Sequence, residues 1–452
     1  MSISIFKLNN NCYHIYDSYG GGLWEFNLSE IKLFLTILDI NQKKKILNHM
    51  NINACYDNKY KLAEINDMIS FIENEEITQN TTFAAKAVID RLNYYDNGII
   101  TAPFTIIEVS RLCNYNCYWC FLDYKDPKVD VALSLNDLIK FVVDPMIDIG
   151  SIHWGITGGE PSLTLEKTLK LSKYIKEVTI RKFNLEPNIM LFTNGHYLSK
   201  NAILYKDAGI STVHVSLSSA NEEQELKLRR PPKNENSYLE VINGIKECKK
   251  IGLNVNLNSV IINDIGYGSN INTMPLMYEL ANTLDVDLFD LNLACPSGEA
   301  KRNCITFSKK DYKKITLNEE RCSKRLKPFI KYCCATGNLE ENRDISCGSG
   351  IIEFYVDYIG NTFPCNNLTD DSLKCDQQTV KEKSIESIWF NSEILRQLRQ
   401  YDKFFVNDEC GKCIYRGFCV GSCIARIWHQ YGLLNLNKRP EYCYLNEFEK
   451  EG

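Results

Sequence analysis

The sequence predicts an α/β protein in which a parallel sheet covered by helices lies between a small N-terminal domain and a cysteine-rich C-terminal region. Short apolar runs alternate with helical stretches over about residues 99–300, the pattern of a parallel sheet. Strand-like runs followed by helices fill the preceding segment, and cysteines become dense after about residue 301. We therefore expect domains at residues 1–80, 101–310 and 311–452, with residues 81–100 as a helical linker.

The N-terminal segment alternates as strands and then becomes helical. Strands are expected at Ile3–Leu8, Cys12–Tyr16 and Leu23–Phe26, with a glycine turn at residues 19–22. Asn27 or Ser29 can cap the helix that follows. Further helices are expected around Gln42–Met50 and Lys61–Glu73. This order of elements suggests a small winged-helix-like domain.

Six apolar runs in the middle of the chain predict the parallel strands. They lie at Thr105–Val109, Ile152–Ile156, Ile189–Phe192, Thr212–Leu217, Asn254–Val260 and Phe289–Leu293. The helices between them are expected at Leu135–Ile149, kinked at Pro145, and at Leu165–Thr179, Ser237–Ile251 and Asn272–Thr283. Because ligands of such sheets bind at the carboxyl ends of the strands, functional residues are expected in the loops that follow them.

Composition narrows the class of protein. The chain has 452 residues, of which 44% are hydrophobic and 24% charged, as in an ordinary folded protein. Its net charge of −5 disfavours a nucleic-acid partner. The first residues do not resemble a signal peptide, and no run approaches the ~20 apolar residues that cross a bilayer. We therefore expect a cytoplasmic protein with no membrane partner.

Nineteen cysteines require an explanation. Disulfides are not expected in a reducing compartment, so metal or cluster binding is the better interpretation. The isolated Cys12, Cys55 and Cys248 are interpreted as ordinary small packing residues. That interpretation does not fit cysteines at fixed, close spacing.

The first close set is Cys113, Cys117 and Cys120, directly after the strand at Thr105–Val109. Three thiolates can hold three irons of a cubane cluster and leave the fourth iron open to a ligand. A three-cysteine zinc loop is the alternative.

Two further short elements follow neighbouring strands at the same edge of the sheet. The first is Gly158-Gly159-Glu160-Pro161, where the glycines permit close backbone approach and the carboxylate can pair with an ammonium group. The second is Thr193-Asn194-Gly195. Each could be only a turn, but their joint placement with the cysteines indicates one site.

The CxxxCxxC loop, with Trp119 before its last cysteine and GGEP one strand later, resembles the radical S-adenosylmethionine (SAM) superfamily over residues 100–300. The resemblance implies a partial (β/α)6 barrel and a 4Fe–4S cluster whose open iron binds SAM. It implies that reductive cleavage of SAM yields a 5′-deoxyadenosyl radical, with electrons from a flavodoxin or ferredoxin. The SAM contacts that it implies are Gly158, Gly159 and Glu160 for the amino group, Ser216 or Ser218 for the ribose, and Arg229 or Arg230 for the carboxylate.

The C-terminal cysteines have a regular spacing. They are Cys347, Cys365, Cys410, Cys413, Cys419, Cys423 and Cys443, with Gly360 between the first two. On spacing alone, a zinc ribbon remains an alternative. The order of all seven resembles the SPASM domain that follows radical SAM cores and carries two auxiliary 4Fe–4S clusters.

The SPASM resemblance also implies ligand sets, giving three 4Fe–4S clusters in the whole chain. One auxiliary cluster would use Cys347, Cys365 and Cys423, with Cys333, Cys334 or an open position as the fourth ligand. The other would use the remaining motif cysteines, which are Cys410, Cys413, Cys419 and Cys443. No role is assigned to Cys295, Cys304, Cys322 or Cys375.

The same resemblance implies a peptide substrate. SPASM enzymes mostly modify peptides, and the N-terminal domain resembles the element by which peptide maturases bind a leader as an added strand. We therefore expect a precursor peptide as partner and thioether formation as the outcome. Maturation of sulfatases is the alternative, although Asn366 stands where that branch has an aspartate base. A non-enzymatic iron–sulfur or zinc module is another, disfavoured by the open three-cysteine site.

Overall fold

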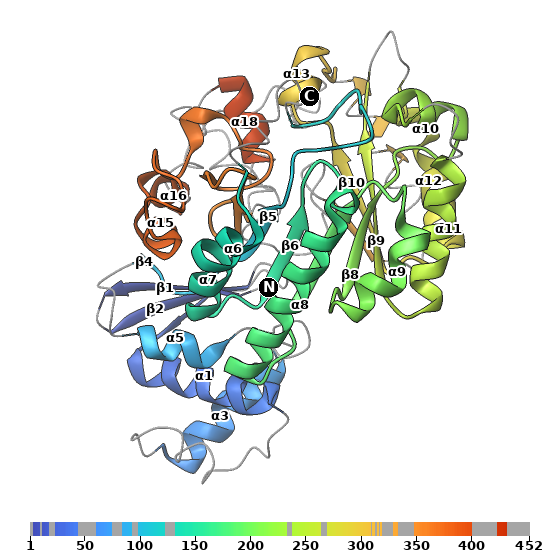
Figure 1. Ribbon diagram of the computed structural model, residues 1–452. Helices are drawn as coiled ribbons and strands as arrows, with labels where there is room; N and C mark the ends of the chain where they lie inside the picture. Colours follow the sequence, from blue (N-terminus) through green and yellow to red (C-terminus); the bar gives the residue numbers. More distant parts are fainter. Residues whose placement is uncertain are drawn as a thin grey trace, which may run out of the picture.

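The computed structural model divides into an N-terminal sheet domain, a curved parallel sheet covered by helices, and a C-terminal region against one side of that sheet (Figure 1). The structure describes residues 3–9, 11–17, 23–43, 60–74, 84–92, 98–122, 132–232, 237–263, 269–308, 310–311, 314–315, 317–318, 329–332, 348–399 and 423–431. In these ranges, no helix is long and apolar enough to cross a membrane.

The N-terminal sheet has four strands in the order β3-β2-β1-β4. They are β1 (Ile3–Asn9), β2 (Cys12–Asp17), β3 (Leu23–Phe26) and β4 (Gly98–Ile99). Helices α1 (Leu28–Gln42), α3 (Leu62–Asn74) and α5 (Ala85–Arg91) complete the domain. The three predicted strands are confirmed, as are the helices expected after residue 27 and at Lys61–Glu73. The turn at 19–22 and most of the helix expected at Gln42–Met50 lie outside the described residues.

Local sequence explains where α1 begins. The Asn27 side chain accepts hydrogen bonds from the backbone of Ser29 and Glu30, and Glu30 accepts one from the Asn27 backbone at 2.8 Å. This reciprocal capping box selects Asn27 over Ser29 as the cap.

The expected helical linker at residues 81–100 contains helix α5 but also strand β4, and α5 belongs to the N-terminal core. Ala85, Val88, Ile89 and Leu92 are buried in one cluster with residues of β1, β2 and α1. β4 pairs with β1, so both ends of the domain meet in one sheet.

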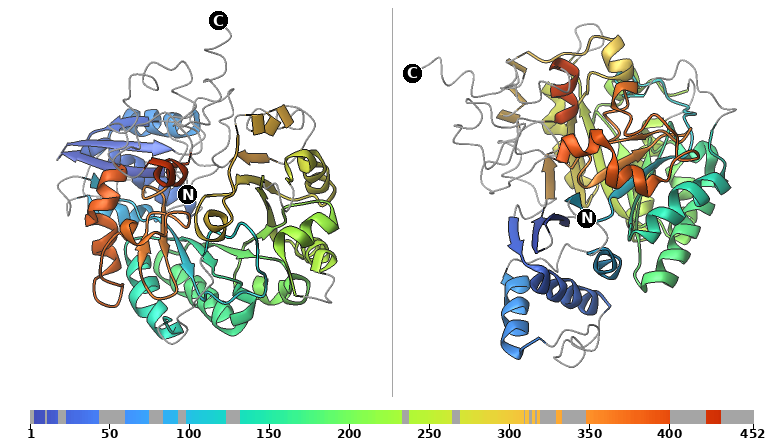
Figure 2. Two further views of the ribbon diagram at one scale, coloured as in Figure 1. Left: turned by 90° about the horizontal axis from the view of Figure 1, so that it is seen from above. Right: turned by 90° about the vertical axis from the view of Figure 1, so that its left-hand side faces the viewer.

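The six predicted parallel strands are confirmed, with ends that differ from the predicted ones by at most one residue. They are β5 (Phe104–Glu108), β6 (His153–Thr157), β7 (Asn188–Thr193), β8 (Thr212–Ser216), β9 (Asn254–Ile261) and β10 (Leu288–Leu293), paired in that order. Figure 2 shows the curvature of this sheet from above, with its helices on the outside.

The sheet extends beyond the six predicted strands on both sides. β11 (Phe329–Tyr332) lies parallel beside β10, and β12 (Glu353–Val356) lies parallel beside β5. β13 (Thr362–Phe363) pairs antiparallel with β12 and completes a nine-stranded sheet. The cysteine-rich region thus donates strands to the barrel sheet itself, which local patterning did not indicate.

Helices cover the outer face of this sheet. The longer ones are α8 (Leu165–Phe183), α9 (Leu198–Asp207), α10 (Glu222–Arg229), α11 (Ser237–Lys250) and α12 (Met274–Thr283). Shorter elements are η3 (Pro161–Thr164), η4 (Ile271–Thr273), α13 (Gly298–Arg302), η5 (Asp371–Leu373), α15 (Ile385–Asn391), α16 (Glu393–Arg399) and α18 (Ile424–Tyr431).

The helix expected at Leu135–Ile149 is irregular before Pro145, not at it. It comprises α6 (Leu135–Leu138), the π segment η2 (Ile139–Val143) and α7 (Asp144–Asp148). Pro145 occupies the first turn of α7, where a helix tolerates the missing N–H.

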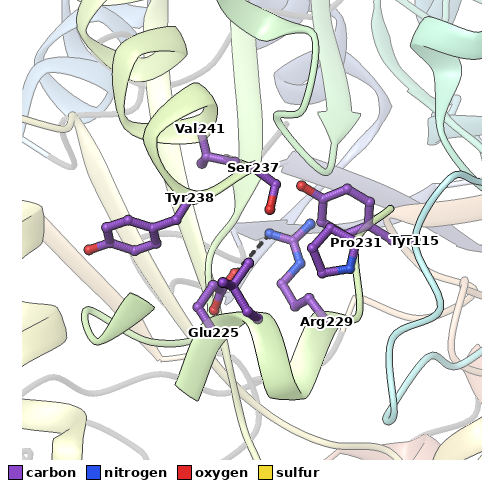
Figure 3. A pocket seen from close by; sticks show the side chains of 8 residues that line it. Tyr115, Glu225, Arg229, Pro231, Ser237, Tyr238 and Val241 are labelled. Carbon is purple, nitrogen blue, oxygen red and sulfur yellow. Dashed lines mark hydrogen bonds and ion pairs between the residues drawn. The ribbon is translucent and has the colours of Figure 1, made fainter. Parts of the chain in front are cut away.

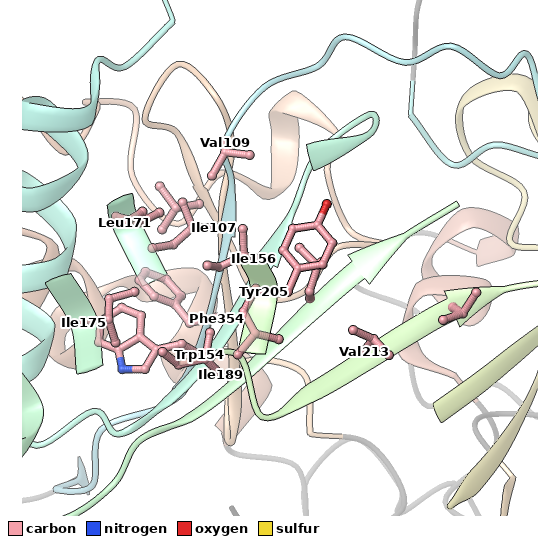
Figure 4. Packing of buried hydrophobic residues seen from close by; sticks show 14 of the residues in the cluster. Ile107, Val109, Trp154, Ile156, Leu171, Ile175, Ile189, Tyr205, Val213 and Phe354 are labelled. Carbon is pink, nitrogen blue, oxygen red and sulfur yellow. The ribbon is translucent and has the colours of Figure 1, made fainter. Parts of the chain in front are cut away.

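One apolar cluster joins the sheet to its helices. Trp154 of β6 and Ile175 of α8 are fully buried in it, and Phe354 of β12 packs in the same layer (Figure 4). Cys248 is also fully buried in this cluster, which confirms it as a packing residue. Cys12 is only half-buried, so its interpretation as a core residue is wrong, and Cys55 lies outside the described residues.

Candidate active site at the carboxyl edge of the barrel

The cysteine loop begins from a buried ionic clamp at the end of β5. Both carboxylate oxygens of Glu108 accept hydrogen bonds from the Arg111 guanidinium at 2.8 Å. Tyr355 of β12 donates a further hydrogen bond to Glu108 at 2.8 Å. Glu108 is fully buried, and the Arg111 guanidinium lies 4.5 Å from the ring centroid of Tyr358. A bidentate pair of this kind fixes the direction in which the loop leaves the strand.

The three cysteines of this loop are all partly buried. The backbone of the loop is held on both sides, because Tyr118 N–H donates to the Leu228 carbonyl and Glu299 N–H donates to the Cys120 carbonyl. Trp119 is buried in an apolar cluster beneath the loop. The loop backbone is therefore held against two neighbouring segments of the protein.

The spacing of the three sulfur atoms differs from that of a tetrahedral zinc site. A tetrahedral zinc ion brings its sulfur ligands to within about 3.8 Å of one another. The Sγ atoms of Cys113, Cys117 and Cys120 do not all lie within 4.8 Å of one another. Burial raises the pKa of the Cys113 thiol to about 12, and it also raises the pKa of Cys117, so a bound cation is needed to hold them as thiolates.

Gly158 and Gly159 are required by the backbone of the cysteine loop. A Cβ atom at Gly158 would lie 2.3 Å from the Ser110 carbonyl oxygen, and one at Gly159 would lie 2.2 Å from the Leu112 carbonyl oxygen. The two segments pair directly, since Gly159 N–H donates to Ser110 and Glu160 N–H donates to Leu112. The two glycines, expected to let the backbone approach a ligand closely, thus also let it approach the cysteine loop.

The Glu160 carboxylate is fully buried and joins two loops. It accepts hydrogen bonds from the Thr193 hydroxyl at 2.9 and 3.1 Å, from Asn194 N–H at 2.7 Å and from Ser162 N–H at 3.0 Å. The Asn194 amide in turn donates to Asn114 Oδ1 at 2.8 Å, inside the cysteine loop. The three elements singled out in the sequence therefore meet at one site, with Glu160 as their link.

Arg229 is a second buried link, on the other side of the loop. It is 2% exposed, pairs with Glu225 at 3.2 Å and donates to the Asn194 carbonyl at 3.1 Å. It also contacts Cys117 and lies 4.8 Å from the ring centroid of Tyr115. These contacts place Arg229 behind the cysteine loop, and its expected pairing with the SAM carboxylate stays a prediction.

The cavity beside Arg229 is too small for a nucleoside. Tyr115, Glu225, Ser237 and Tyr238 line it (Figure 3), and its volume of about 10 Å³ is that of about one water. Burial raises the pKa of Glu225, while the facing Arg229 lowers it. These residues hold the cysteine loop in position, and the cavity between them is not a substrate pocket.

The two candidate ribose contacts, Ser216 and Ser218, differ in where they lie relative to the inside of the barrel. Val213 and Val215 of β8 are buried in the core under the helices, so Ser216 lies on the opposite, inner face. Ser218 is 1% exposed, and its N–H donates to Glu225 at 2.9 Å. Ser216 therefore has the better position for a ligand inside the barrel.

The inner face also carries polar residues that the motif search missed. His214 Nδ1 lies 3.5 Å from Asp290 Oδ2, and Asn292 donates to Asn258 at 2.6 Å. Strand alternation could have identified them, because they recur at every second position on the face turned away from the helices.

Only part of the C-terminal cysteine set lies in the described residues. Cys365 and Cys423 are both 7% exposed, and Gly360 adopts a φ of 96° in the turn between β12 and β13. Cys375, left unassigned, is buried in the main core. The predicted ligands Cys347, Cys410, Cys413, Cys419 and Cys443, and the candidates Cys333 and Cys334, lie outside the described residues.

Fold and site together define an enzyme built on a parallel barrel, with a three-cysteine cluster loop and a glycine-rich turn at its carboxyl edge. Residues 107–281 match the Radical SAM superfamily. This segment is therefore a radical SAM domain, which makes the protein an enzyme, and the family of this domain implies SAM and a 4Fe–4S cluster as cofactors.

Curated relatives resemble different shares of the chain. An AdoMet-dependent heme synthase from Methanosarcina barkeri is 24% identical over 72% of this chain and 92% of its own length. A GTP 3′,8-cyclase from Helicobacter pylori is 34% identical over 35% of this chain. The match spans about half (47%) of that cyclase's own length.

Solved structures extend the likeness in fold. SuiB from Streptococcus suis, bound to the precursor peptide SuiA, superposes with a TM-score of 0.65 over 97% of this chain and 98% of its own, at 14% identity. The protein anSMEcpe with bound AdoMet has a TM-score of 0.56 over 77% of this chain and 94% of its own, at 18% identity. The N-terminal sheet domain is thus part of a fold shared with SuiB.

Proposed function

We propose that this radical SAM enzyme modifies a ribosomally made precursor peptide, forming thioether crosslinks from a peptide cysteine to a backbone or side-chain carbon. The observation that carries the proposal is the N-terminal sheet with an open edge, joined to a radical SAM barrel. β3 is the outermost strand, and no other described strand pairs with its outer side. An extended leader peptide can add there as a further strand.

The fold comparison supports a peptide substrate. SuiB, which shares the fold over 97% of this chain, has been solved with its precursor peptide SuiA. The shared part includes both the sheet that would bind a leader and the barrel that would hold the reacting residue.

Each loop at the carboxyl edge has a role in this chemistry. When bound, the reduced cluster and SAM supply a 5′-deoxyadenosyl radical that takes a hydrogen atom from the substrate. Cys113, Cys117 and Cys120 would hold the cluster irons. Gly158, Gly159 and Glu160 set the position of that loop against its neighbours and line the expected amino-group site. The barrel wall excludes water from the reacting atoms.

Two auxiliary 4Fe–4S clusters in a SPASM domain are part of the proposal, with an external flavodoxin or ferredoxin as electron donor. Thioether formation releases one electron beyond the hydrogen atom, and an auxiliary cluster can accept it. Burial of Cys365 and Cys423 suits cluster ligands, but it also suits structural thiols.

Sulfatase maturation is the second candidate, because anSMEcpe shares the fold over 77% of this chain. The residue after Cys365 argues against it. Asn366 carries an amide that cannot accept a proton at neutral pH, whereas that branch uses an aspartate there.

The test uses the full chain with reconstituted clusters, reduced anaerobically with SAM and the peptide encoded by a neighbouring short reading frame. We expect 5′-deoxyadenosine together with a peptide that has lost two hydrogen atoms and its free thiol. Formation of 5′-deoxyadenosine without peptide modification would reject the substrate, and absence of 5′-deoxyadenosine would reject the radical chemistry. Conversion of cysteine to an aldehyde would favour the sulfatase-type reaction.

Hydrogen exchange can locate the docking edge. On adding the peptide, amides of β3 are expected to gain protection, whereas β4 at the other edge of the sheet serves as the internal control. A leader that protects neither edge, while the peptide is still modified, would reject docking by strand addition.

A further inference from the structure

Three side chains with metal-binding atoms meet on the N-terminal sheet. This sheet and the barrel are separate parts of the fold (Figure 1). The sulfur of Cys12, one imidazole nitrogen of His14 and a carboxylate oxygen of Glu25 all lie within 4.8 Å of one another. His14 Nε2 is 3.2 Å from Glu25 Oε2. In the described part of the chain, this is the one group of at least three Cys, His, Asp or Glu side chains that meets this distance.

The register of the sheet produces this meeting. Cys12 and His14 are two residues apart on β2, so their side chains lie on one face. His14 is paired directly with Glu25 of β3 across the antiparallel ladder. Tyr13 and Ile15 point to the other face, into the core beneath α1. The three ligand side chains therefore lie on the sheet face opposite that core.

The donor set fits one class of ion. A thiolate and an imidazole are ligands for zinc and similar transition metals, whereas calcium and magnesium take oxygen ligands. A thiolate and a carboxylate together carry two negative charges, which match a divalent cation. Three protein ligands leave one tetrahedral position for water or an external donor.

The three side chains are accessible enough to bind a metal ion from solution. The His14 side chain is 30% exposed and that of Glu25 is 71% exposed, while Cys12 is half-buried. Two of the ligands are thus held on one strand, and the third, Glu25, is the most exposed and lies on the neighbouring strand.

We propose that Cys12, His14 and Glu25 form a binding site for one divalent transition-metal ion of the zinc class, distinct from the iron–sulfur sites. The site lies on β2 and β3 and does not depend on the identity of the peptide substrate.

The experiment uses the full chain with its clusters loaded, passed over a chelating resin and titrated with Zn²⁺ by isothermal titration calorimetry. We expect one Zn²⁺ equivalent whose affinity falls at least tenfold in Cys12→Ala and in His14→Ala. Cys304→Ala is the matched control, because Cys304 is an exposed thiol away from the site. Iron content and SAM cleavage in all variants should equal those of the parent, which shows that they are folded.

X-ray absorption at the zinc edge provides the second measurement. One sulfur ligand with nitrogen and oxygen neighbours is expected. Several sulfur ligands would place the zinc at cluster cysteines and overturn the proposal. Unchanged affinity in both site variants, or no zinc binding by the parent chain, would also overturn it.

Discussion

Polar side chains are buried at the carboxyl edge of the barrel, whereas those on the outer face of the N-terminal sheet are exposed. At the barrel edge, Glu108 and Glu160 are fully buried and Arg229 is 2% exposed, each bound to other parts of the protein. On the sheet, His14 and Glu25 remain open to solvent. The difference indicates a site whose shape is held by buried contacts within the protein, whereas the polar groups of the sheet remain accessible to a partner.

The comparison predicts the largest loss for Arg229→Ala. Removing one partner of a buried ion pair leaves Glu225 uncompensated, which costs about 3–5 kcal/mol. The Asn194 carbonyl and the Cys117 sulfur lose a contact as well. Thermal unfolding and iron content after reconstitution measure the effect, and both should fall. Arg229→Lys keeps the charge but not the geometry and should restore only part of the stability. A stable Arg229→Ala variant with full iron content would contradict the fixed-site interpretation.

A slightly smaller loss is expected for Gly158→Ala. The added methyl group would overlap the Ser110 carbonyl, so the two backbones must separate, at a cost of about 1–3 kcal/mol. We expect 5′-deoxyadenosine formation to fall at least tenfold because the cysteine loop moves. Ser162→Ala, in the same turn, removes a hydroxyl that has no hydrogen-bond partner and serves as the control. Equal rates for both variants would show that the loop tolerates movement.

The buried Asp357 carboxyl group makes the folding stability of the barrel region depend on pH. Burial, with a contribution from the Glu108 carboxylate, raises its pKa to about 6. Because the unfolded value is about 3.9, the folded state holds an extra proton between roughly pH 4 and 6. Stability from this group is therefore greatest at low pH and is lost as the pH rises through 6, by at most about 3 kcal/mol.

The corresponding variant is Asp357→Asn, which cannot ionise. Its free energy of unfolding relative to the parent should increase from pH 4 to 6.5 and then level off, as followed by denaturant unfolding. Asp371→Asn, at a carboxylate that is 92% exposed, is the matched control for an aspartate-to-asparagine change. A pH-independent difference for Asp357→Asn would contradict a raised pKa.

The smallest effect is expected on the N-terminal sheet. Glu25→Gln removes the carboxylate of an exposed contact with His14, and such exposed contacts are worth less than about 1 kcal/mol. The melting temperature, measured without added metal, should change little, and SAM cleavage should be unaffected. A large destabilisation would mean that the sheet face is as rigidly organised as the barrel edge.

Local sequence determined much of the molecule. Short apolar runs separated by helical stretches located all six core strands, since both patterns depend on neighbouring residues alone. The loops after β5, β6 and β7 were identified because parallel strands place their carboxyl ends at one edge. Local sequence also narrowed the N-cap of α1 to two candidates, Asn27 and Ser29.

Only the tertiary structure decided how those elements meet. β12 pairs with β5 from almost 250 residues away, and no local pattern encodes that pairing. The burial of Arg229 and the turn of the Glu160 carboxylate toward Thr193 depend on side chains from several loops. Cys12 looked like an isolated packing residue because its neighbours in space, His14 and Glu25, are set by strand register. Spacing along the chain identifies which residues can act, while long-range pairing decides which of them act together.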